Sequence, residues 1–257
     1  LHKAIRRQRQ MCIRDRIIIA TFNAEKVLER CLKGLKLQKK DEVEILIIDG
    51  ASTDHTVSIV KKNLGVVDII LSEPDRGIYD AWNKGIKLAH GKYIMFLGAD
   101  DYLYPDAISS YLDFISKMKA DCDIISAKSE FVDSKGRIMK VIGEKFSYHR
   151  HKVNMYIAHG TCLHNKILFE RYGMFSLRYK VCADYEFFMR LENVNSAFMN
   201  KVVMKFYAGG ASFSVNCLKE TFAIRKEYKS VSTALNCFLF FKRLVGLYYK
   251  KLVFKHG

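Results

Sequence analysis

Motifs that would identify several common protein classes are missing from this chain. Seven cysteines are scattered without a C-x-x-C pair, so neither a disulfide framework nor a thiolate zinc site is supported, and reduced thiols are expected. No window approaches the roughly 18 uninterrupted apolar residues that a membrane-spanning helix needs. No secretory signal follows the basic N-terminus. Glycine-rich G-x-G-x-x-G and G-x-x-x-x-G-K-S/T loops are also missing, which leaves dinucleotide and P-loop phosphate binding unsupported.

Positive charge is abundant but unevenly placed. The formal net charge of +16 raises the possibility of nucleic-acid binding. Residues 1–16 contain six Lys or Arg and one acidic residue, Asp15. Residues 217–257 contain nine Lys or Arg and two Glu. Because residues 8–16 resemble a translated adapter junction, residues 1–16 are expected to be a non-native leader. With charge at both ends, no basic groove runs through the chain, which weakens the nucleic-acid hypothesis.

Apolar runs alternate with amphipathic stretches through the first half of the chain. Strand–helix alternation is typical of an α/β fold with a doubly wound, mostly parallel sheet flanked by helices. From about residue 123 the pattern becomes mixed, with a hairpin turn expected at residues 133–136. Only two prolines and no low-complexity tract occur, so one compact domain with a helical tail is expected. The expected strands are 17–20, 43–48, 66–71, 92–97 and 124–127, with strand material within 196–207. The expected helices are 24–37, 56–62, 78–90, one from Pro105, 167–172 and 184–191.

Two adjacent carboxylates end the most informative of these strands. The apolar run of residues 92–97 reads as a buried strand and is followed by Gly98, Asp100 and Asp101. Ligands of open α/β sheets collect outside the carboxyl ends of strands, where paired aspartates suit a hard divalent cation held against a phosphate. The alternative is a turn in which an aspartate caps the helix near Pro105. Loops 21–23 and 49–54 should emerge at the same edge of the sheet.

Four motifs occur together in a defined order: ATFN at residues 20–23, IDGASTD at 48–54, EPDRGIYDAWNKG at 73–85 and FLGADD at 96–101. In order and spacing they resemble the family 2 glycosyltransferases, most closely the bacterial branch that builds colanic-acid-type surface polysaccharides. The resemblance covers residues 17–215 and implies the GT-A fold, with a nucleotide-sugar-binding half at 17–122 and an acceptor-binding half at 123–215. It also implies a nucleotide-diphosphate-sugar donor, a Mg²⁺ or Mn²⁺ ion and inversion at the anomeric carbon.

The resemblance assigns donor contacts to the first two loops. Thr21, Asn23 and Asp49 would hold the nucleobase and ribose, and Ser52 matches the same loop. A carboxylate can accept from a pyrimidine N3–H, which favours a UDP-sugar. Alternatively, Asn23 caps the helix that follows it. Asp54 is expected to be a turn former or helix cap.

Further roles follow from the other motifs. Arg76 and Asp80, at the start of the 78–90 helix, would lie at the diphosphate, since a guanidinium and a helix N-terminus both suit phosphate; an ordinary solvated loop is the alternative. Asp100 and Asp101 match the metal-binding acidic pair. Asp184 is the candidate catalytic base, by resemblance to the family's Glu-Asp motif. A helix cap is its alternative role, and Glu186 is the fallback base.

The tail at residues 216–257 interleaves aromatic clusters with basic pairs. This composition suits an interfacial helix on anionic lipid, and acceptors for surface glycans are commonly polyprenyl-linked. It equally suits a terminal helix packed on the domain with a basic outer face. A cytoplasmic protein with peripheral contact to the inner face of the membrane is expected. The competing functions are a basic nucleic-acid-binding protein and a sugar-1-phosphate nucleotidyltransferase, which would need a glycine-rich basic loop after the first strand.

Overall fold

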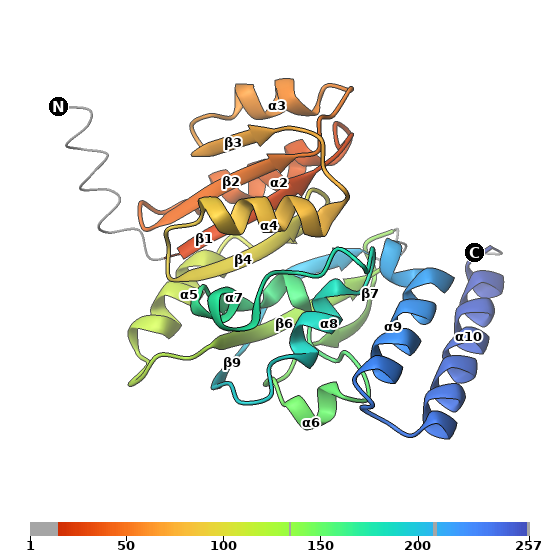
Figure 1. Ribbon diagram of the computed structural model, residues 1–257. Coiled ribbons are helices and arrows are strands. Elements are labelled where there is room, and N and C mark those ends of the chain that lie inside the picture. Colours follow the sequence, from red (N-terminus) through yellow and green to blue (C-terminus); the bar gives the residue numbers. More distant parts are fainter. Residues whose placement is uncertain (1–14, 134, 208–209, 256–257) are drawn as a thin grey trace.

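A single curled sheet organises the chain, as the computed structural model shows for residues 15–133, 135–207 and 210–255 (Figure 1). Its strand order is β3-β2-β1-β4-β8-β6-β9-β5, with β7 paired to β6. The first four strands are parallel and are connected through helices. They are β1 (Asp15–Thr21), β2 (Val43–Asp49), β3 (Ile69–Ser72) and β4 (Tyr93–Gly98), with α2 (Leu28–Lys36), α3 (Thr56–Lys62) and α4 (Ile78–Leu88) between them.

The second half adds strands of both directions to the β4 edge. Strand β8 is antiparallel to both β4 and β6, so β6 runs parallel to β4, and β9 is parallel to β6. The elements are β5 (Tyr102–Leu103), α5 (Ala107–Ser116), β6 (Ile124–Val132), β7 (Ile138–Ile142), α6 (Tyr148–His151), η1 (His159–Thr161), β8 (Leu163–Asn165), α7 (Ile167–Tyr172), α8 (Ala183–Met189), β9 (Ser196–Tyr207), η2 (Ala211–Phe213), α9 (Val215–Glu227) and α10 (Thr233–Lys255). The mixed α/β fold with a mostly parallel sheet is confirmed.

Both faces of the parallel strands are buried, which explains why their sequences are continuously apolar. Side chains alternate between faces along a strand. Ile18 packs with Trp82 of α4 in one core cluster, whereas Ile17 and Ile19 pack with Leu28 of α2 in the other. Hydrophobic side chains therefore pack on both faces of the strands whose ends form the site.

Several expected boundaries shift, and two elements begin three or four residues later than expected. Helix α2 begins at Leu28 rather than at residue 24. The preceding backbone N–H groups of Ala24 and Glu25 donate to Thr56 and Asp54 in the next loop. Strand β3 begins at Ile69 rather than at residue 66, since a turn precedes it. These bonds tie the loop after β1 to the loop after β2.

Two residues of the expected leader belong to the first strand of the domain. Asp15 and Arg16 pair in register with Val43 and Glu44 as the start of β1. Arg16 is buried, forms an ion pair with Glu44 and donates to the Leu88 carbonyl. Strand β1 therefore begins at Asp15 instead of Ile17. The rest of the expected leader, residues 1–14, lies outside the described residues.

The close approach of α4 to β1 requires a glycine and yields a stability prediction. A Cβ added to Gly85 would lie 2.5 Å from Ile18 Cγ2. We expect Gly85→Ala to lower the free energy of unfolding by about 1–3 kcal/mol, because a well-packed core must shift to admit the methyl group. Urea denaturation measures the change.

Gly246→Ala provides the matched control, since Gly246 also lies in a helix but has open space around its Cα. That change should be neutral or stabilising by up to about 1 kcal/mol through helix propensity. Equal effects of the two substitutions would contradict the packing argument.

Candidate active site at the carboxyl ends of the strands

The polar loops singled out from the sequence follow strand ends that lie side by side. In the sheet register, Asp49 pairs with both Thr21 and Ser72, and Ala20 pairs with Gly98. The last residues of β3, β2, β1 and β4 thus form one row across the sheet. Side chains from four neighbouring connections are presented at this edge.

Asp49 is the centre of a hydrogen-bond network at this edge. Its carboxylate is fully buried. Oδ1 accepts from Thr21 Oγ1 at 2.9 Å and from Ser52 Oγ at 2.5 Å, while Oδ2 accepts from Ser52 N at 2.9 Å and from Ser72 Oγ at 2.7 Å. Burial alone would raise the pKa of Asp49, but the bonds from Ser52, Ser72 and Thr21 outweigh it and hold the pKa below its ordinary value.

Asn23 contributes to the same network instead of capping α2. Its backbone N–H donates to Ser52 Oγ at 2.8 Å, and its side-chain Oδ1 accepts from Thr53 N at 2.9 Å. The φ angle of Asn23 is 47°, a left-handed conformation that Asn tolerates well. Asp54 accepts the backbone N–H groups of Thr56 and Glu25, so it shapes the turn.

The loop before α4 places the exposed Arg76 side chain beside the Asp80 carboxylate. Asp80 Oδ2 accepts from the backbone N–H of Arg76 at 3.0 Å, so this carboxylate fixes the loop. The Arg76 side chain is 75% exposed, with Nε 3.6 Å from the same oxygen. Arg76 is therefore available to an anionic ligand. Asp75 packs against Gly50, where an added Cβ would be 2.6 Å from Asp75 Oδ2, and it connects this loop to the Asp49 loop.

Asp100 and Asp101 do not cap the following helix. Strand β5 intervenes, and α5 begins only at Ala107 without a side-chain cap. Asp101 Oδ2 instead accepts from Gly98 N at 2.8 Å, closing a tight turn over the end of β4. Both carboxylates lie close to Gly98, since a Cβ there would be 2.9 Å from Asp100 Oδ1 and 3.5 Å from Asp101 Oδ2.

The two carboxylates differ in their surroundings. Asp100 is exposed, whereas Asp101 is half-buried. Loss of hydration raises the pKa of Asp101 to about 7, and the neighbouring Asp100 charge adds to the shift. A cation beside Asp101 would stabilise its charged form and lower its pKa.

These carboxylates fit a divalent metal that arrives with phosphate ligands. Among the described residues, no three His, Cys, Asp or Glu side chains cluster as a metal site. Mg²⁺ is usually bound through one or two carboxylates, waters and substrate phosphates, and Mn²⁺ also prefers oxygen ligands. Asp100 and Asp101 supply two such oxygen donors. The donor set therefore fits a cation shared with a diphosphate.

A series of neighbouring residues leads from Asp101 to Asp184. Asp101 Oδ2 is 3.7 Å from the position of a Cβ on Gly160. The neighbouring His159 ring lies 5.2 Å from Trp82, whose ring lies 5.4 Å from Tyr79. Tyr79 Oη is 2.9 Å from Asp184 Oδ1 and can donate to it. Side chains far apart in the sequence thus join the acidic pair to Asp184.

Asp184 is half-buried at the first turn of α8. Burial raises its pKa to about 6, although bonds from Tyr185 N and the Tyr79 hydroxyl oppose the shift. Glu220 of α9 accepts the N–H groups of three residues just before α8: Lys180, Val181 and Cys182. Asp184 Oδ1 also accepts from Tyr185 N at 2.8 Å, a bond within the first turn of α8, so this carboxylate stabilises the helix end as well.

Glu186, the fallback base, has other partners. It is buried, with Oε1 2.5 Å from the Tyr228 hydroxyl and Oε2 3.1 Å from Arg190 Nη2. The bond to Tyr228 joins α8 to the end of α9, and the two bonds together occupy both carboxylate oxygens. Glu186 therefore has a structural role in this arrangement.

Sequence reasoning missed Ser72 and Tyr79. Ser72 follows an inconspicuous strand, and nothing local marks its bond to Asp49. Tyr79 lies inside the recognised 73–85 motif, next to Asp80, so its position offered a signal. Its partner Asp184 is 105 residues away, which no local pattern reveals.

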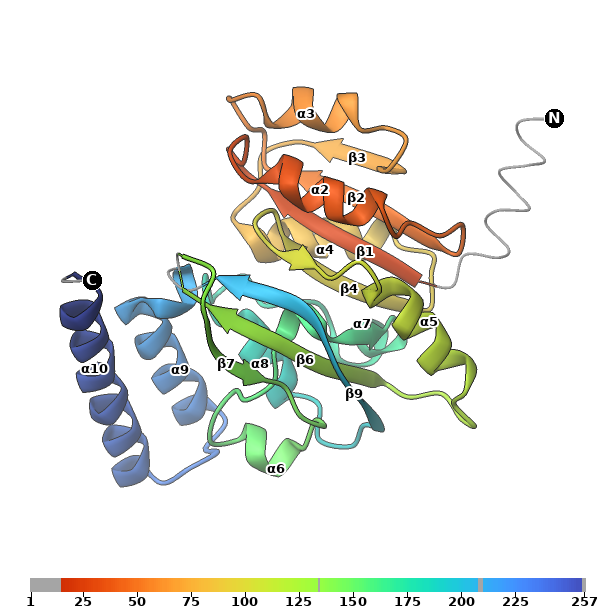
Figure 2. The ribbon, with the colours of Figure 1, turned by 180° about the vertical axis from the view of Figure 1, so that it is seen from behind.

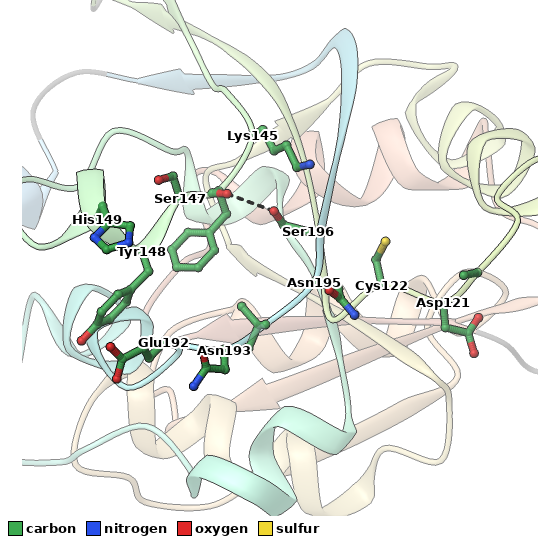
Figure 3. A pocket seen from close by; sticks show the side chains of 13 residues that line it. Asp121, Cys122, Lys145, Ser147, Tyr148, His149, Glu192, Asn193, Asn195 and Ser196 are labelled. Atoms are coloured by element: carbon green, nitrogen blue, oxygen red, sulfur yellow. Dashed lines mark hydrogen bonds between the residues drawn. The ribbon is translucent and has the colours of Figure 1, made fainter.

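The hollow in Figure 3 is separate from this site. It measures about 860 Å³ and is lined by residues that include Lys145, Tyr148 and Asn193. It lies near Ile124 and Ser196, where β6 and β9 begin. Because β6 runs parallel to β4, the hollow lies at the opposite edge of the sheet from Asp101.

The hydrogen bonds to Asp49 lead to a prediction about the free energy of unfolding. We expect Ser72→Ala to reduce the free energy of unfolding by about 1 kcal/mol, because a buried carboxylate loses one donor. The comparison is Ser109→Ala, which removes an exposed hydroxyl that donates to the Asp106 carbonyl. Chemical denaturation of both variants measures the difference, and equal stabilities would contradict the role given to Ser72.

Comparison with known proteins identifies the family. The model of "Glycosyl transferase family 2" matches residues 16–185. The chain is 35% identical over 182 residues to a PGL/p-HBAD biosynthesis glycosyltransferase of Mycobacterium tuberculosis, covering 68% of each chain. These relatives do not distinguish the colanic-acid-type branch, which stays a prediction.

Solved structures resemble the fold. S. aureus TarS residues 1–349 in complex with UDP-GlcNAc gives a TM-score of 0.69 at 20% identity, covering 84% of this chain and 66% of that one. A mannosyltransferase of Pyrobaculum calidifontis in complex with GDP-Man and Mn²⁺ gives 0.60 at 17% identity, covering 82% and 63%. This chain therefore spans slightly less than two thirds of each solved chain. It has the GT-A fold and belongs to the family 2 glycosyltransferases.

Proposed function

We propose that this chain transfers a sugar from a nucleotide-diphosphate sugar to a hydroxyl of a glycan or lipid-linked acceptor, with inversion at the anomeric carbon, in surface polysaccharide biosynthesis. The supporting observation, in a member of this family, is the series of neighbouring residues that leads from Asp101 at the sheet edge through Trp82 and Tyr79 to Asp184. A donor, a cation and an acceptor hydroxyl all need groups at one place.

The donor nucleoside would bind beside Thr21, Asn23, Asp49 and Ser52. Asp49 has a full set of donors, so a direct contact with a pyrimidine N3–H requires one donor to leave. Ser72 is the candidate, because it is exposed at the outer side of the network. A uridine donor fits this exchange, and a UDP-sugar complex of a similar fold is known for TarS.

The diphosphate would lie between Arg76 and the acidic pair. Arg76 can reach an anion because its guanidinium is exposed, while Asp80 keeps the loop in place. Asp101 and Asp100 would hold Mg²⁺ or Mn²⁺. The bound cation would stabilise the charge of the departing nucleoside diphosphate.

Asp184 would be the base. As the acceptor oxygen forms its bond to the anomeric carbon, the bond from that carbon to the diphosphate oxygen breaks, and the hydroxyl proton passes to Asp184. A single displacement inverts the anomeric centre. Tyr79 would orient the carboxylate and favour its charged form through the hydrogen bond to Oδ1.

Donor and metal binding are tested with Asp101→Asn. A thermal-shift panel of UDP-, GDP-, dTDP- and CDP-sugars, each with and without MnCl₂, should show Mn²⁺-dependent stabilisation of the wild type by a UDP-sugar. The variant should lose this Mn²⁺-dependent part because it lacks the carboxylate charge. Asn can still accept from Gly98 N, so the fold should persist.

Asp113→Asn is the control, since Asp113 is an exposed carboxylate on α5. It should respond like the wild type. If no nucleotide sugar stabilises the wild type, the proposed donor class is wrong. If Asp101→Asn keeps the full Mn²⁺ response, the metal assignment is wrong.

The base assignment predicts a pH dependence. Asp184 acts as a base only when deprotonated, so the rate of transfer should rise with pH through about 6. Tyr79→Phe removes a bond to the charged form, which raises the pKa of Asp184 and should move the rising limb to higher pH. Initial rates of the wild type and of Tyr79→Phe, measured from about pH 4.5 to about pH 8.5, give the shift of the rising limb.

Asp184→Asn should lower the rate by about 10² to 10⁴ while donor binding persists. Glu186→Gln should affect stability and leave the rising limb in place, because Glu186 bonds to Tyr228 and Arg190. Loss of donor binding in Asp184→Asn, or an unchanged limb in Tyr79→Phe, would argue against the assigned base.

A further inference from the structure

Helix α10 carries an apolar stripe that no described part of the chain covers. Phe238, Phe241, Val245 and Tyr248 are 61%, 62%, 69% and 56% exposed. Their spacings of three, four and three residues place them on one side of an α-helix. Exposed aromatic side chains gathered in this way usually mark an interaction surface.

The opposite side of α10 is attached to the domain. Asn236 accepts from Arg225 Nε at 2.7 Å and donates to the Phe222 carbonyl at 3.0 Å. The rings of Phe240 and Phe222 lie 5.7 Å apart. Figure 1 shows α10 as the outermost helix, packed on α9. The two readings of the tail are therefore compatible, since one face packs and the other is free.

The charge of α10 favours a negatively charged partner. Across its 23 residues it has five Lys or Arg and no Asp or Glu; the basic residues are Lys242, Arg243, Lys250, Lys251 and Lys255. Two copies packed through α10 would bring these like charges together, which disfavours a self-association surface.

We propose that the α10 stripe docks on the surface of an anionic lipid bilayer, with the helix lying in the interface. A helix of this length extends about 35 Å, long enough for its aromatic side chains to enter the lipid boundary along several turns. Basic side chains near the headgroups add attraction to anionic lipid. In the described part of the chain, none of the helices has the length and hydropathy needed to cross a bilayer.

Docking through α10 would bring the candidate active site close to the lipid surface. In Figure 2 the arrows of β6 and β9 point toward α9 and α10, and β6 is parallel to β4. Glu220 of α9 also caps the segment just before Asp184. A lipid-linked acceptor could then reach the active site at the membrane. This delivery of the acceptor rests on the proposed function, whereas binding of α10 to lipid does not.

Vesicle sedimentation tests the docking surface. The full chain is mixed with vesicles of phosphatidylglycerol and phosphatidylcholine in equal parts, and separately with pure phosphatidylcholine. We expect binding to the anionic vesicles that weakens as salt is added. The triple variant Phe238→Ser, Phe241→Ser, Val245→Ser should bind at least about tenfold more weakly because it loses buried apolar area.

The control is Leu37→Ser with Leu64→Ser, which replaces residues of 77% and 59% exposure elsewhere in the fold and should bind like the wild type. Absence of wild-type binding, or equal binding by the triple variant, overturns the proposal. So does a stripe-dependent dimer in sedimentation velocity without lipid binding. A nucleotide-sugar thermal shift in the triple variant reports separately on the donor site, so failure of one proposal is distinguishable from failure of the other.

Discussion

The Asp49 carboxylate receives hydrogen bonds from the ends of β1 and β3 and from its own loop, and the geometry of the strand edge depends on this contact. An ionised group without partners would be costly at such a buried position. Four donors offset this cost and keep the carboxylate charged. The same bonds fix Ser52, which in turn fixes Asn23. Loops from three strands are therefore positioned by one buried anion before any ligand binds.

A second constraint is electrostatic. Burial raises the pKa of Asp101 to about 7 and that of Asp184 to about 6, so both carboxyl groups hold their charge weakly at neutral pH. Stability alone gives little reason to keep two acidic groups in such surroundings, and perturbed carboxyl groups are common at functional sites. The different surroundings separate their roles: Asp101 lies beside another carboxylate, whereas Asp184 accepts from Tyr79.

The distribution of charge also explains why a high net charge was a poor guide to function. Carboxylates gather at the strand edge, while a concentration of basic residues lies on α10. A nucleic-acid groove would need basic and stacking groups along one surface. Family membership and the GT-A fold favour glycosyl transfer over both nucleic-acid binding and nucleotidyl transfer. The tail and the site remain connected through Glu220, which links α9 to the start of α8.

Elements with strong periodicity were predictable from the sequence. Helices α3 and α7 have the expected bounds, and β9 lies where strand material was expected, because local patterning and burial agree there. The short β5 and β8 were not expected, since two or three residues carry no period and their pairing depends on partners far along the chain. The family, the fold class and the acidic pair at the end of β4 could therefore be inferred without coordinates.

The contacts that give the site its chemistry were decided by tertiary structure. The sequence, through its family resemblance, marked Asp49 as a donor contact and Asp184 as the candidate base, but it did not give their partners. Only the folded chain brings Ser72 to Asp49 and Tyr79 to Asp184, and only packing on α9 leaves one side of α10 exposed. The reason is physical: local patterns determine which residues are apolar or turn-forming, whereas hydrogen-bond partners and pKa shifts depend on distances between segments that meet only in the fold.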